Sequence, residues 1–434
     1  MILEIDALDA EGRGVARNAG KVVFVEGAIT GELVEARLLE SKPKFDRARA
    51  TSILRASASR REPRCPYFGV CGGCATQHVD ARTQVAAKQR WLEDNLARIG
   101  KLSGKDAPGA ILSPIHGAEW GYRQRARLSV RYVEGKGGAL VGFRERRSTH
   151  VADMLSCEVL PPGIAALIAP LRMLIGSLSI RDRVPQVEIA VGEAATVLLF
   201  RHLLPLSGAD HALLREFADA RAVHVWLQSA GPETVAPFHP VVHDALYYDL
   251  PEFGVRIAFQ PSDFTQVNPA VNRLLVSRAV RLLDPQPGER VADLFCGIGN
   301  FSLPLATRGA QVIGFEGSEL LVERARQNAA ANGLVAQFEV ADLFGPNLAA
   351  VLGNYGRFDK FLVDPPREGA ASLVHALPDE WPRRIVYVSC DPATLARDAD
   401  VLVHHKGFRL AAAGVVNMFP HTAHVESLAL FERD

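Results

Sequence analysis

The sequence lacks long apolar runs, lacks an excess of charge of either sign and has few cysteines. Its most apolar stretch, residues 164–180, is interrupted by Pro170 and Arg172 and is too short to cross a bilayer. The first six residues lack the basic start and apolar run of a secretory signal, so we expect a cytoplasmic protein without membrane contact. In that compartment the 6 cysteines are candidates for metal binding or for chemistry before they are candidates for disulfides.

The balance of 49 basic and 49 acidic residues excludes a general attraction of the whole molecule to nucleic acid. Two segments depart from this balance, because residues 42–64 and 123–147 are rich in Arg and Lys. Either segment alone is as typical of a solvated face as of a binding site. Together, and with Tyr122, Tyr132 and Phe143 in or beside the second one, they favour a phosphate-rich partner.

A chain of 434 residues predicts about three domains. Residues 1–57 alternate apolar and polar positions between glycines, which predicts a small β-barrel. Residues 58–258 predict a central α+β domain, which opens with a Cys-, Gly- and Pro-rich loop. A helical segment at about 79–110 could pack on the third domain. Residues 259–434 alternate strands and helices, which predicts an α/β fold of the Rossmann-like type.

Several elements of the third domain can be predicted individually. The expected strands are 290–295, 311–316, 338–340, 360–363, 384–389 and a last strand after residue 426, and the expected helices are 301–307, 319–332 and 392–404. The expected sheet is parallel and covered by helices on both faces. Ligands of such sheets bind at the carboxyl ends of the strands.

The first motif is the loop Asp293–Phe301, which reads Asp-Leu-Phe-Cys-Gly-Ile-Gly-Asn-Phe and lies between an expected strand and an expected helix. Gly297 and Gly299 let the backbone approach a bound nucleoside, and Glu316 ends the next strand, where a carboxylate can hold both ribose hydroxyls. A plain tight turn is the alternative interpretation. Position 302 is Ser rather than a third glycine, which favours S-adenosylmethionine over a dinucleotide.

The second motif is Val363–Arg367, which reads Val-Asp-Pro-Pro-Arg and follows an expected strand. Its prolines predict a rigid loop that aims Asp364 into the ligand cleft, although a simple strand-ending turn is also compatible. Methyltransferases that act on exocyclic amines use a similar loop. The motif therefore supports methyl transfer and leaves the target atom open.

The third motif places Cys390 between an expected strand and a helix that begins at Pro392. The positive end of the helix dipole lowers the pKa of a nearby thiol, so we expect a nucleophile, with a buried structural thiol as the alternative. Addition of a thiolate to carbon 6 of uracil makes carbon 5 electron-rich enough to attack an electrophilic methyl group. A base must then remove the proton from carbon 5, and Glu426 is the candidate. His421 and His424 fit loop packing or RNA contact better than metal ligation.

The fourth motif groups three cysteines, Cys65, Cys71 and Cys74, in a glycine-rich loop, with Cys157 far away in the sequence. Four thiolates can hold a zinc ion or a [4Fe-4S] cluster, and the three-plus-one spacing fits a cluster better than a paired zinc ribbon. Accidental free thiols are the remaining alternative.

Together these motifs resemble the RNA uracil-C5 methyltransferases, specifically the RumA/RlmD type that modifies 23S ribosomal RNA. The resemblance implies an N-terminal TRAM domain, which is an OB-like β-barrel, a central iron-sulfur domain and a methyltransferase domain. It implies Cys390 as nucleophile, Glu426 as base and a [4Fe-4S] cluster on Cys65, Cys71, Cys74 and Cys157. The S-adenosylmethionine contacts that it implies are Gln266, Phe295, Asn300, Glu316, Asp342 and Asp364.

We therefore expect a monomeric 23S rRNA (uracil-5-)-methyltransferase, with another ribosomal RNA site or tRNA as the alternative substrate. Two competing functions stay open at this point. One is an amino-group methyltransferase built on Asp364, and the other is an RNA-binding module without enzymatic activity.

Overall fold

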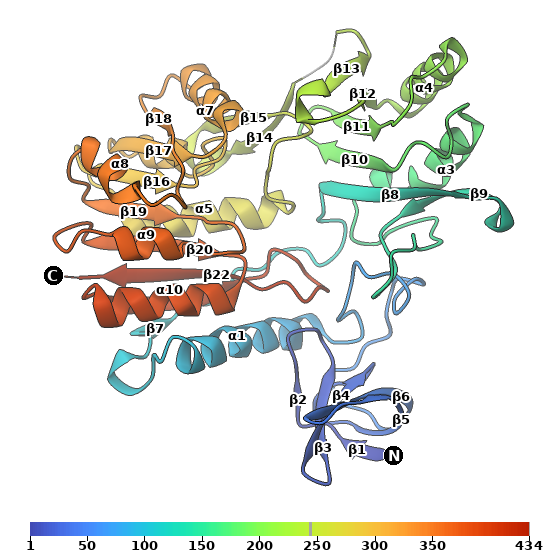
Figure 1. Cartoon of the computed structure of the whole chain (residues 1–434), viewed down its shortest axis with the longest axis horizontal. Coiled ribbons are helices and arrows are strands. Elements are labelled where there is room, and N and C mark those ends of the chain that lie inside the picture. Colours follow the sequence, from blue (N-terminus) through green and yellow to red (C-terminus); the bar gives the residue numbers. More distant parts are fainter. Residues whose placement is uncertain (243–244, 434) are drawn as a thin grey trace.

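The structure is a computed structural model that describes residues 1–242 and 245–433, so Asp434 of the predicted third domain lies outside it. The described residues form four β-sheets, which Figure 1 shows in three groups. Helices cover the sheets of the central and C-terminal groups, whereas the N-terminal strands stand apart. None of the helices in the described ranges has the length and apolarity that a bilayer span requires.

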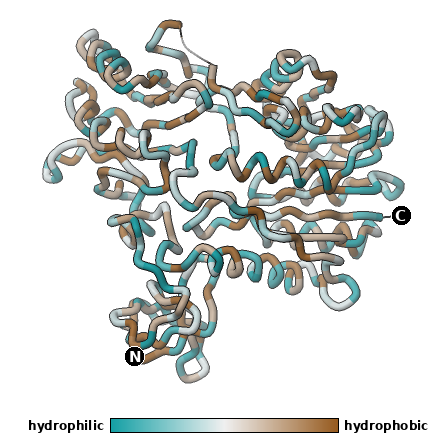
Figure 2. Tube along the Cα trace, turned by 180° about the vertical axis from the view of Figure 1, so that it is seen from behind, coloured by the Kyte–Doolittle hydropathy of each residue, from teal (hydrophilic) through white to brown (hydrophobic). Residues whose placement is uncertain are grey.

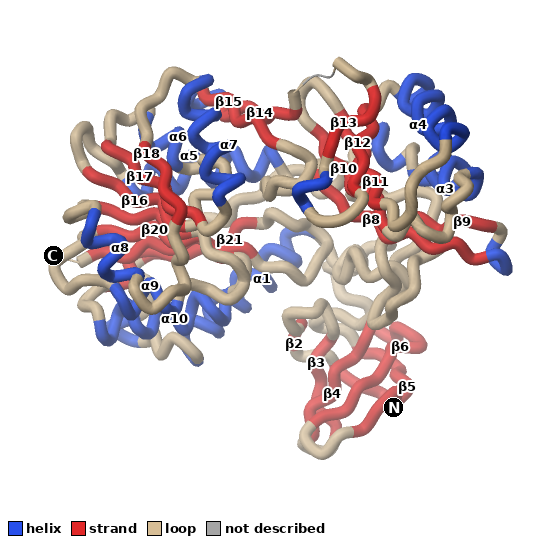
Figure 3. The backbone as a smooth tube through the Cα atoms, turned by 45° about the horizontal axis from the view of Figure 1, so that its top comes forward, coloured by secondary structure: helices blue, strands red, loops and turns tan. Residues whose placement is uncertain are grey.

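The N-terminal strands form one six-stranded sheet in the order β1-β5-β6-β4-β3-β2. Their bounds are β1 Ile2–Glu4, β2 Ala7–Leu8, β3 Gly14–Asn18, β4 Lys21–Glu26, β5 Leu33–Ser41 and β6 Phe45–Arg55. Alternate residues such as Val23, Val25 and Ala48 point into a small core. Figure 3 shows that this sheet projects from the rest of the chain. The basic segment 42–64 thus contains the longest strand of this sheet, which its charges concealed in the sequence.

The central six-stranded sheet has the order β13-β12-β11-β10-β8-β9. Its strands are β8 Arg125–Val133, β9 Gly138–Gly142, β10 Gln186–Val191, β11 Thr196–Arg201, β12 His224–Gln228 and β13 Ala236–His239, and its helices are α2 Pro162–Ala165, α3 Ile168–Ser177 and α4 Gly208–Arg221. The apolar stretch 164–180 forms α2 and α3, whose Ile168, Leu171 and Ile175 are buried against the sheet.

The C-terminal sheet has eight strands in the order β18-β17-β16-β19-β20-β22-β21-β7. The strands are β7 Ala110–Ile111, β16 Arg290–Leu294, β17 Gln311–Glu316, β18 Gln337–Val340, β19 Lys360–Val363, β20 Arg384–Ser389, β21 Arg409–Val416 and β22 Glu426–Glu432. Its helices are α5 Pro269–Leu283, α6 Ser302–Ala306, α7 Glu319–Ala331, α8 Leu348–Asn354, α9 Ala371–Ala376 and α10 Pro392–His405. Figure 2 shows apolar residues concentrated along the strands of this sheet.

The sequence prediction of an all-parallel sheet is wrong for the C-terminal strands. The strands from β18 to β20 are parallel, whereas β22 pairs antiparallel with both β20 and β21. The cause is the connection between β21 and β22, a short loop without a helix, which returns the chain in the opposite direction. As a result β22 begins beside the end of β20.

Two segments that precede the third domain in sequence pack on its sheet. Helix α1 Ala81–Arg98 contacts α10 and β21, and β7 pairs with β21. The buried face of α1 carries Gln84, Lys88 and Leu92, whereas the large apolar side chains of Trp91 and Ile99 are exposed. Strands β14 Leu246–Leu250 and β15 Val255–Phe259 form a hairpin held by Asn328 and Asn332 of α7 and its C-cap.

Candidate active site

The loop after β16 has the backbone that a close approach requires. Gly297 and Gly299 have φ of +53° and +93°, in the left-handed region that favours glycine. An added Cβ at Gly297 would meet open space, so the backbone conformation, and not a clash with a neighbour, disfavours a larger residue there. On the neighbouring β17, a Cβ at Gly314 would lie 2.7 Å from the Phe338 ring and 2.8 Å from Cys296 Sγ. Glycine at position 314 of β17 therefore lets Phe338 of β18 and Cys296, in the loop after β16, pack closely against this strand.

Glu316 lies against this loop from the end of β17. Its Oε2 accepts a hydrogen bond from the Gly297 N–H at 3.2 Å, and its Oε1 accepts one from the Ser318 N–H at 3.1 Å. The carboxylate is half-buried. The position at the carboxyl end of β17, next to a glycine loop, is the one that the sequence pattern predicts for a ribose-binding acid.

The side chain of Asn300 is held by two residues that the sequence analysis missed. Its Oδ1 accepts from the Tyr248 hydroxyl and from Asn272 Nδ2, both at 2.9 Å, and its Nδ2 donates to Asn272 Oδ1 at 3.1 Å. Burial raises the pKa of Tyr248 well above its ordinary value, so this phenol stays a donor, and no motif around Tyr248 or Asn272 signalled the contact. Asn300 is thus fixed at the start of α6 by groups from β14 and α5.

Two aromatic rings face each other beside the loop. The Phe295 and Phe344 ring centroids are 5.5 Å apart, and Phe344 is 48% exposed. Asp342 lies between β18 and Phe344, is exposed, and accepts a hydrogen bond from the Phe344 N–H at 3.0 Å. Exposed rings with an acidic neighbour can hold the edge and faces of a nucleobase. Phe344 was missed because no motif marks the loop after β18.

The remaining predicted cofactor residues lie at two other strand ends. Asp364 follows β19, and burial raises the pKa of this carboxyl group to about 7. Gln266 is half-buried in the loop between β15 and α5. In the same loop Phe264 is 71% exposed, which is unusual for a large apolar side chain next to a site.

Cys390 and Glu426 lie opposite each other at the end of two strands. The antiparallel register of β20 and β22 pairs Ser389 with Ser427, and continuation by one residue places Cys390 opposite Glu426. Directly opposed side chains of an antiparallel pair are near neighbours on one face of the sheet. The geometry therefore brings the predicted nucleophile and the predicted base together, although they are distant in sequence.

Cys390 lies just before helix α10, yet its pKa is not lowered. Burial, with the carboxyl groups of Glu426 and Asp364, raises the pKa of Cys390 to about 11, while Arg367 opposes the rise. The sequence expectation of a depressed thiol pKa is therefore wrong for the ligand-free site. Asp391 caps the helix and accepts from the N–H groups of Ala393 and Thr394, so an anion already occupies the positive end of the dipole.

Glu426 is 4% exposed, and burial raises its pKa to about 8. Asp364 raises the pKa further, whereas the charge of Lys88 on α1 lowers it. The sequence analysis missed Lys88. The available signal was a lysine on the buried face of an otherwise apolar stripe, one helical turn before Leu92.

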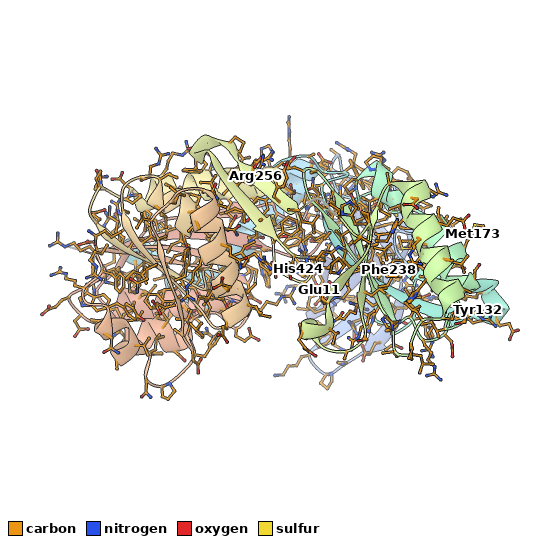
Figure 4. The ribbon with its side chains drawn as sticks, turned by 90° about the horizontal axis from the view of Figure 1, so that it is seen from above. Glu11, Tyr132, Met173, Phe238, Arg256 and His424 are labelled. Atoms are coloured by element: carbon orange, nitrogen blue, oxygen red, sulfur yellow. The ribbon has the colours of Figure 1, made fainter. Side chains whose placement is uncertain are left out.

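The two histidines near Glu426 serve different contacts. His421 is buried and stacks on Trp120 with the ring centroids 3.9 Å apart. Its Nδ1 lies 3.1 Å from Gln84 Nε2. His424 is exposed and its Nδ1 lies 2.8 Å from Arg367 Nη2. Figure 4 places His424 near the middle of the molecule, between the central and C-terminal groups. Packing of the loop by His421 agrees with the sequence interpretation.

The four predicted cluster ligands line one cavity of about 180 Å³, which has Thr422 and His424 at another wall. Burial raises the pKa of Cys74 to about 11 and that of Cys157 to about 12, and it raises the pKa of Cys65 and Cys71 as well. Within residues 1–242 and 245–433, no three His, Cys, Asp or Glu side chains converge as ligands of a single ion. The thiols therefore surround a space rather than a point, and the [4Fe-4S] cluster stays a prediction.

A groove of about 920 Å³ runs between the N-terminal sheet and the cysteine loop. Arg49, Arg144, Arg146 and Arg147 line it together with Phe68 and His78. Many arginines of the two basic segments have acidic partners elsewhere in the chain, among them Arg49 and Arg147 with Glu26, Arg55 with Glu4 and Arg60 with Glu32. The net positive charge of the segments is therefore smaller than their composition indicates.

Comparison with known families matches two models to this chain. Residues 249–434 match the tRNA (Uracil-5-)-methyltransferase model, and residues 3–51 match the TRAM domain model. The solved structure of a Pyrococcus abyssi tRNA (uracil-54, C5)-methyltransferase in complex with S-adenosyl-L-homocysteine aligns over 99% of both chains, with 25% identity and a TM-score of 0.76. The S-adenosylmethionine methyltransferase fold and the N-terminal TRAM domain are thus confirmed.

Two curated relatives match essentially the whole chain. A 23S rRNA (uracil(1939)-C(5))-methyltransferase RlmD of Thiobacillus denitrificans is 61% identical over 100% of this chain and 99% of its own length. The enzyme of the same name from Nitrosospira multiformis is 58% identical over 99% of this chain and 98% of its own. With the glycine loop, Glu316 and the opposed Cys390 and Glu426 at the strand ends, the chain belongs to the family of S-adenosylmethionine-dependent 23S rRNA (uracil-C5)-methyltransferases.

Proposed function

We propose that this enzyme methylates carbon 5 of the uridine that corresponds to position 1939 of 23S ribosomal RNA, through a covalent bond between Cys390 and carbon 6. The observation that carries the mechanism is the register that sets Cys390 opposite Glu426. The full-length similarity to enzymes named for that nucleotide supports the substrate. Another ribosomal RNA site or a tRNA is the alternative.

The reaction uses the two opposed side chains in turn. The Cys390 thiolate adds to carbon 6, and the ring electrons move to carbon 5, which becomes the nucleophile. S-adenosylmethionine supplies the methyl cation equivalent and leaves as S-adenosylhomocysteine. Glu426 then accepts the proton of carbon 5, the carbon 5–carbon 6 double bond re-forms, and the bond between carbon 6 and sulfur breaks. The thiolate is restored and the product RNA is free to leave.

Because the pKa of Cys390 is raised, nearby charges control how much of the thiol is ionised. Burial first, and then the carboxyl groups of Glu426 and Asp364, raise the pKa of the thiol and favour its protonated form before ligands arrive. A bound sulfonium near the strand ends adds a positive charge that counters these carboxyl groups and favours the thiolate. Arg367 acts in the same direction from the loop after β19. The nucleophile is therefore generated once the cofactor is bound.

We propose the same six cofactor contacts that the resemblance implies. Glu316 holds the ribose hydroxyls, and Phe295, Asp342 and Phe344 hold the adenine. The backbone of the loop around Asn300 lies close to the bound cofactor. Asp364, whose carboxyl group acts on the Cys390 thiol, and Gln266 complete the set. The exposed Phe264 next to Gln266 is placed to stack on a base of the RNA.

We propose that Cys65, Cys71, Cys74 and Cys157 hold a [4Fe-4S] cluster. The four thiols line one shared cavity of about 180 Å³, and four thiolates are the ligand set that such a cluster takes. Gly72 supports the loop geometry, since a Cβ there would lie 3.0 Å from the Arg144 carbonyl oxygen. Bound metal would keep all four thiols ionised against their raised pKa values.

The division into residues 1–57, 58–258 and 259–434, the monomeric state and the cytoplasmic location belong to the same proposal. The groove beside the TRAM domain, with Phe68 and Arg144, is the proposed path of RNA outside the catalytic cleft. Contact of RNA with such a groove as well as with the catalytic cleft is typical of proteins that bind RNA through its shape, base stacking and phosphate contacts.

The deciding experiment combines nucleoside analysis with position mapping. Ribosomal RNA from a strain without the enzyme is expected to lack 5-methyluridine at position 1939, and the purified enzyme restores it. Methylation of tRNA instead, or an N-methylated purine or cytosine as product, would overturn the proposal.

A further inference from the structure

Lys88 is a buried lysine that the reaction outlined above does not use. It lies on α1, far in sequence from the methyltransferase domain, and is 6% exposed. A lysine is rarely buried without a function or a partner, because removal of an ammonium group from water is costly. Burial accordingly lowers the pKa of Lys88 to about 7.

The side chain of Lys88 is fixed on the segment that leads to Glu426. Its Nζ donates to Asn417 Oδ1 and to the Phe419 carbonyl oxygen, each at 2.8 Å. One turn earlier on α1, Gln84 Oε1 accepts from the His421 N–H at 2.9 Å. Helix α1 therefore holds the loop between β21 and β22 at several points, just before Glu426 begins β22.

The charged and titratable groups that face Lys88 come from the same few elements. Glu426 at the start of β22 raises the pKa of Lys88, and Asp364 from the loop after β19 acts in turn on Glu426. Burial, and after it the charge of Lys88, lowers the pKa of the His421 imidazole to about 4, and burial with the charges of Arg367, Arg123 and Lys88 lowers that of His424 to about 4 as well. His421 thus stays neutral, which leaves Lys88 as the cation that bears on Glu426.

We propose that Lys88 is a positioning residue for proton removal: held on the loop that leads to Glu426, its buried ammonium group favours the ionised form of the Glu426 carboxyl group. This inference rests on the proposed role of Glu426. An isolated buried carboxylate takes up a proton, and a protonated Glu426 cannot accept one from carbon 5. With one proton shared by the Lys88–Glu426 pair, the reactive form has that proton on Lys88.

The sign of the pH effect follows from the charge. Lys88 favours the ionised form of Glu426, so its loss raises the pKa of the carboxyl group further. The rate of adduct breakdown, which needs ionised Glu426, then begins to rise only at higher pH. If the pKa of Glu426 rises by about one unit, adduct breakdown becomes roughly tenfold slower at any pH well below that pKa.

The test compares Lys88→Gln with Lys88→Arg and with the wild-type enzyme. Glutamine can still donate to Asn417 and Phe419 but carries no charge, while arginine keeps the charge. Lys101→Gln is the matched control, because Lys101 has a side chain that is 70% exposed and pairs with Asp400. Adduct formation is followed with 5-fluorouridine RNA, and adduct breakdown with uridine RNA in single turnovers at pH 6 to 9.

The expected result is normal adduct formation by Lys88→Gln, accumulation of its uridine adduct, and a breakdown profile that is shifted to higher pH by about one unit. Lys88→Arg and Lys101→Gln keep the wild-type profile. A Lys88→Gln enzyme that is folded by thermal melting but has an unshifted profile would overturn the proposal, as would equal losses in adduct formation and breakdown. If Lys88→Gln does not fold, Lys88→Met, which also lacks the charge, takes its place: the same shift to higher pH with retained adduct formation supports the proposal, and an unshifted profile overturns it. Failure of the wild-type enzyme to form any fluorouridine adduct would instead contradict the proposed function.

Discussion

The chain holds two kinds of cysteine neighbourhood, and their difference is informative. Cys390 lies alone at the end of β20 opposite Glu426, whereas Cys65, Cys71, Cys74 and Cys157 surround a shared cavity. Burial raises the pKa of the thiols in both places. At Cys390 the opposing charge comes with the ligands and leaves with them, while at the cavity a resident metal would supply it permanently. A reactive thiol and structural thiols can therefore start from the same protonated state.

The largest effect is expected from removal of the lone thiol. Cys390→Ala should lose turnover by at least about 10³-fold, because addition to carbon 6 is the step that activates carbon 5. Binding of S-adenosylmethionine and of RNA, measured by equilibrium titration, should stay near the wild-type values. Retained turnover in Cys390→Ala would remove the distinction between the two neighbourhoods.

The next effect concerns the residue opposite the lone thiol. Glu426→Gln should slow turnover by about 10² to 10⁴-fold, since the carbon 5 proton loses its acceptor. The methylated RNA should stay attached to Cys390 and be visible as a shifted band on a denaturing gel. An enzyme that releases product at the normal rate would exclude Glu426 as the base.

The cavity thiols should respond differently. Cys71→Ser should lower the iron content and the thermal stability of the purified enzyme, because a ligand and a deprotonated thiolate are lost together. The folded fraction should still form the fluorouridine adduct within about tenfold of the wild-type rate, since Cys390 is not among the residues that line the cavity of Cys71. Complete loss of adduct formation by folded protein would mean that the cluster takes part in the chemistry.

The pH dependence should also separate the two sets of thiols. A thiol pKa of about 11 at Cys390 in the ligand-free site means that its thiolate fraction rises with pH throughout the neutral range. Alkylation of Cys390 by iodoacetamide should therefore accelerate about tenfold per pH unit between pH 7 and 9, and bound S-adenosylmethionine should move this rise to lower pH. The four cavity cysteines should not be alkylated while metal is bound.

The smallest effect is expected at the groove beside the TRAM domain. Arg144→Ala should weaken RNA binding a few-fold and reduce the salt dependence of the binding constant by about one counterion. Arg55→Ala, whose side chain pairs with Glu4, should change neither quantity measurably. Equal effects of the two variants would place the RNA elsewhere on the surface.

The sequence predicted best those elements whose pattern has one physical cause. The strands 311–316, 360–363 and 384–389 match the structure residue for residue, because buried parallel strands are continuous apolar runs. Strand β6 was missed, since its inward residues are small and its outward ones are arginines with partners from other strands. The antiparallel direction of β22 was missed as well, because strand direction depends on a connection that leaves no periodic signal.

Within the site, local sequence motifs predicted the residues at the strand ends, but the sequence did not predict contacts between segments that are distant along the chain. The glycine loop, Asp364, Cys390 and Glu426 each follow from a local pattern. The hydrogen bonds of Tyr248 and Asn272 to Asn300, and that of Lys88 to the loop before Glu426, arise only when α1, α5 and β14 pack on the sheet. The raised thiol pKa at Cys390 has the same origin, because the carboxyl groups that cause it come from other strands.

The most direct measurement is identification of the residue that becomes attached to RNA. The enzyme is incubated with S-adenosylmethionine and 5-fluorouridine RNA, digested, and its RNA-linked peptide is sequenced by mass spectrometry. The account predicts a peptide that spans residues 384–397 with the added mass on Cys390, and none from Cys390→Ala. Attachment at a cavity cysteine, or 5-methyluridine formation by Cys390→Ala at the wild-type rate, would contradict it.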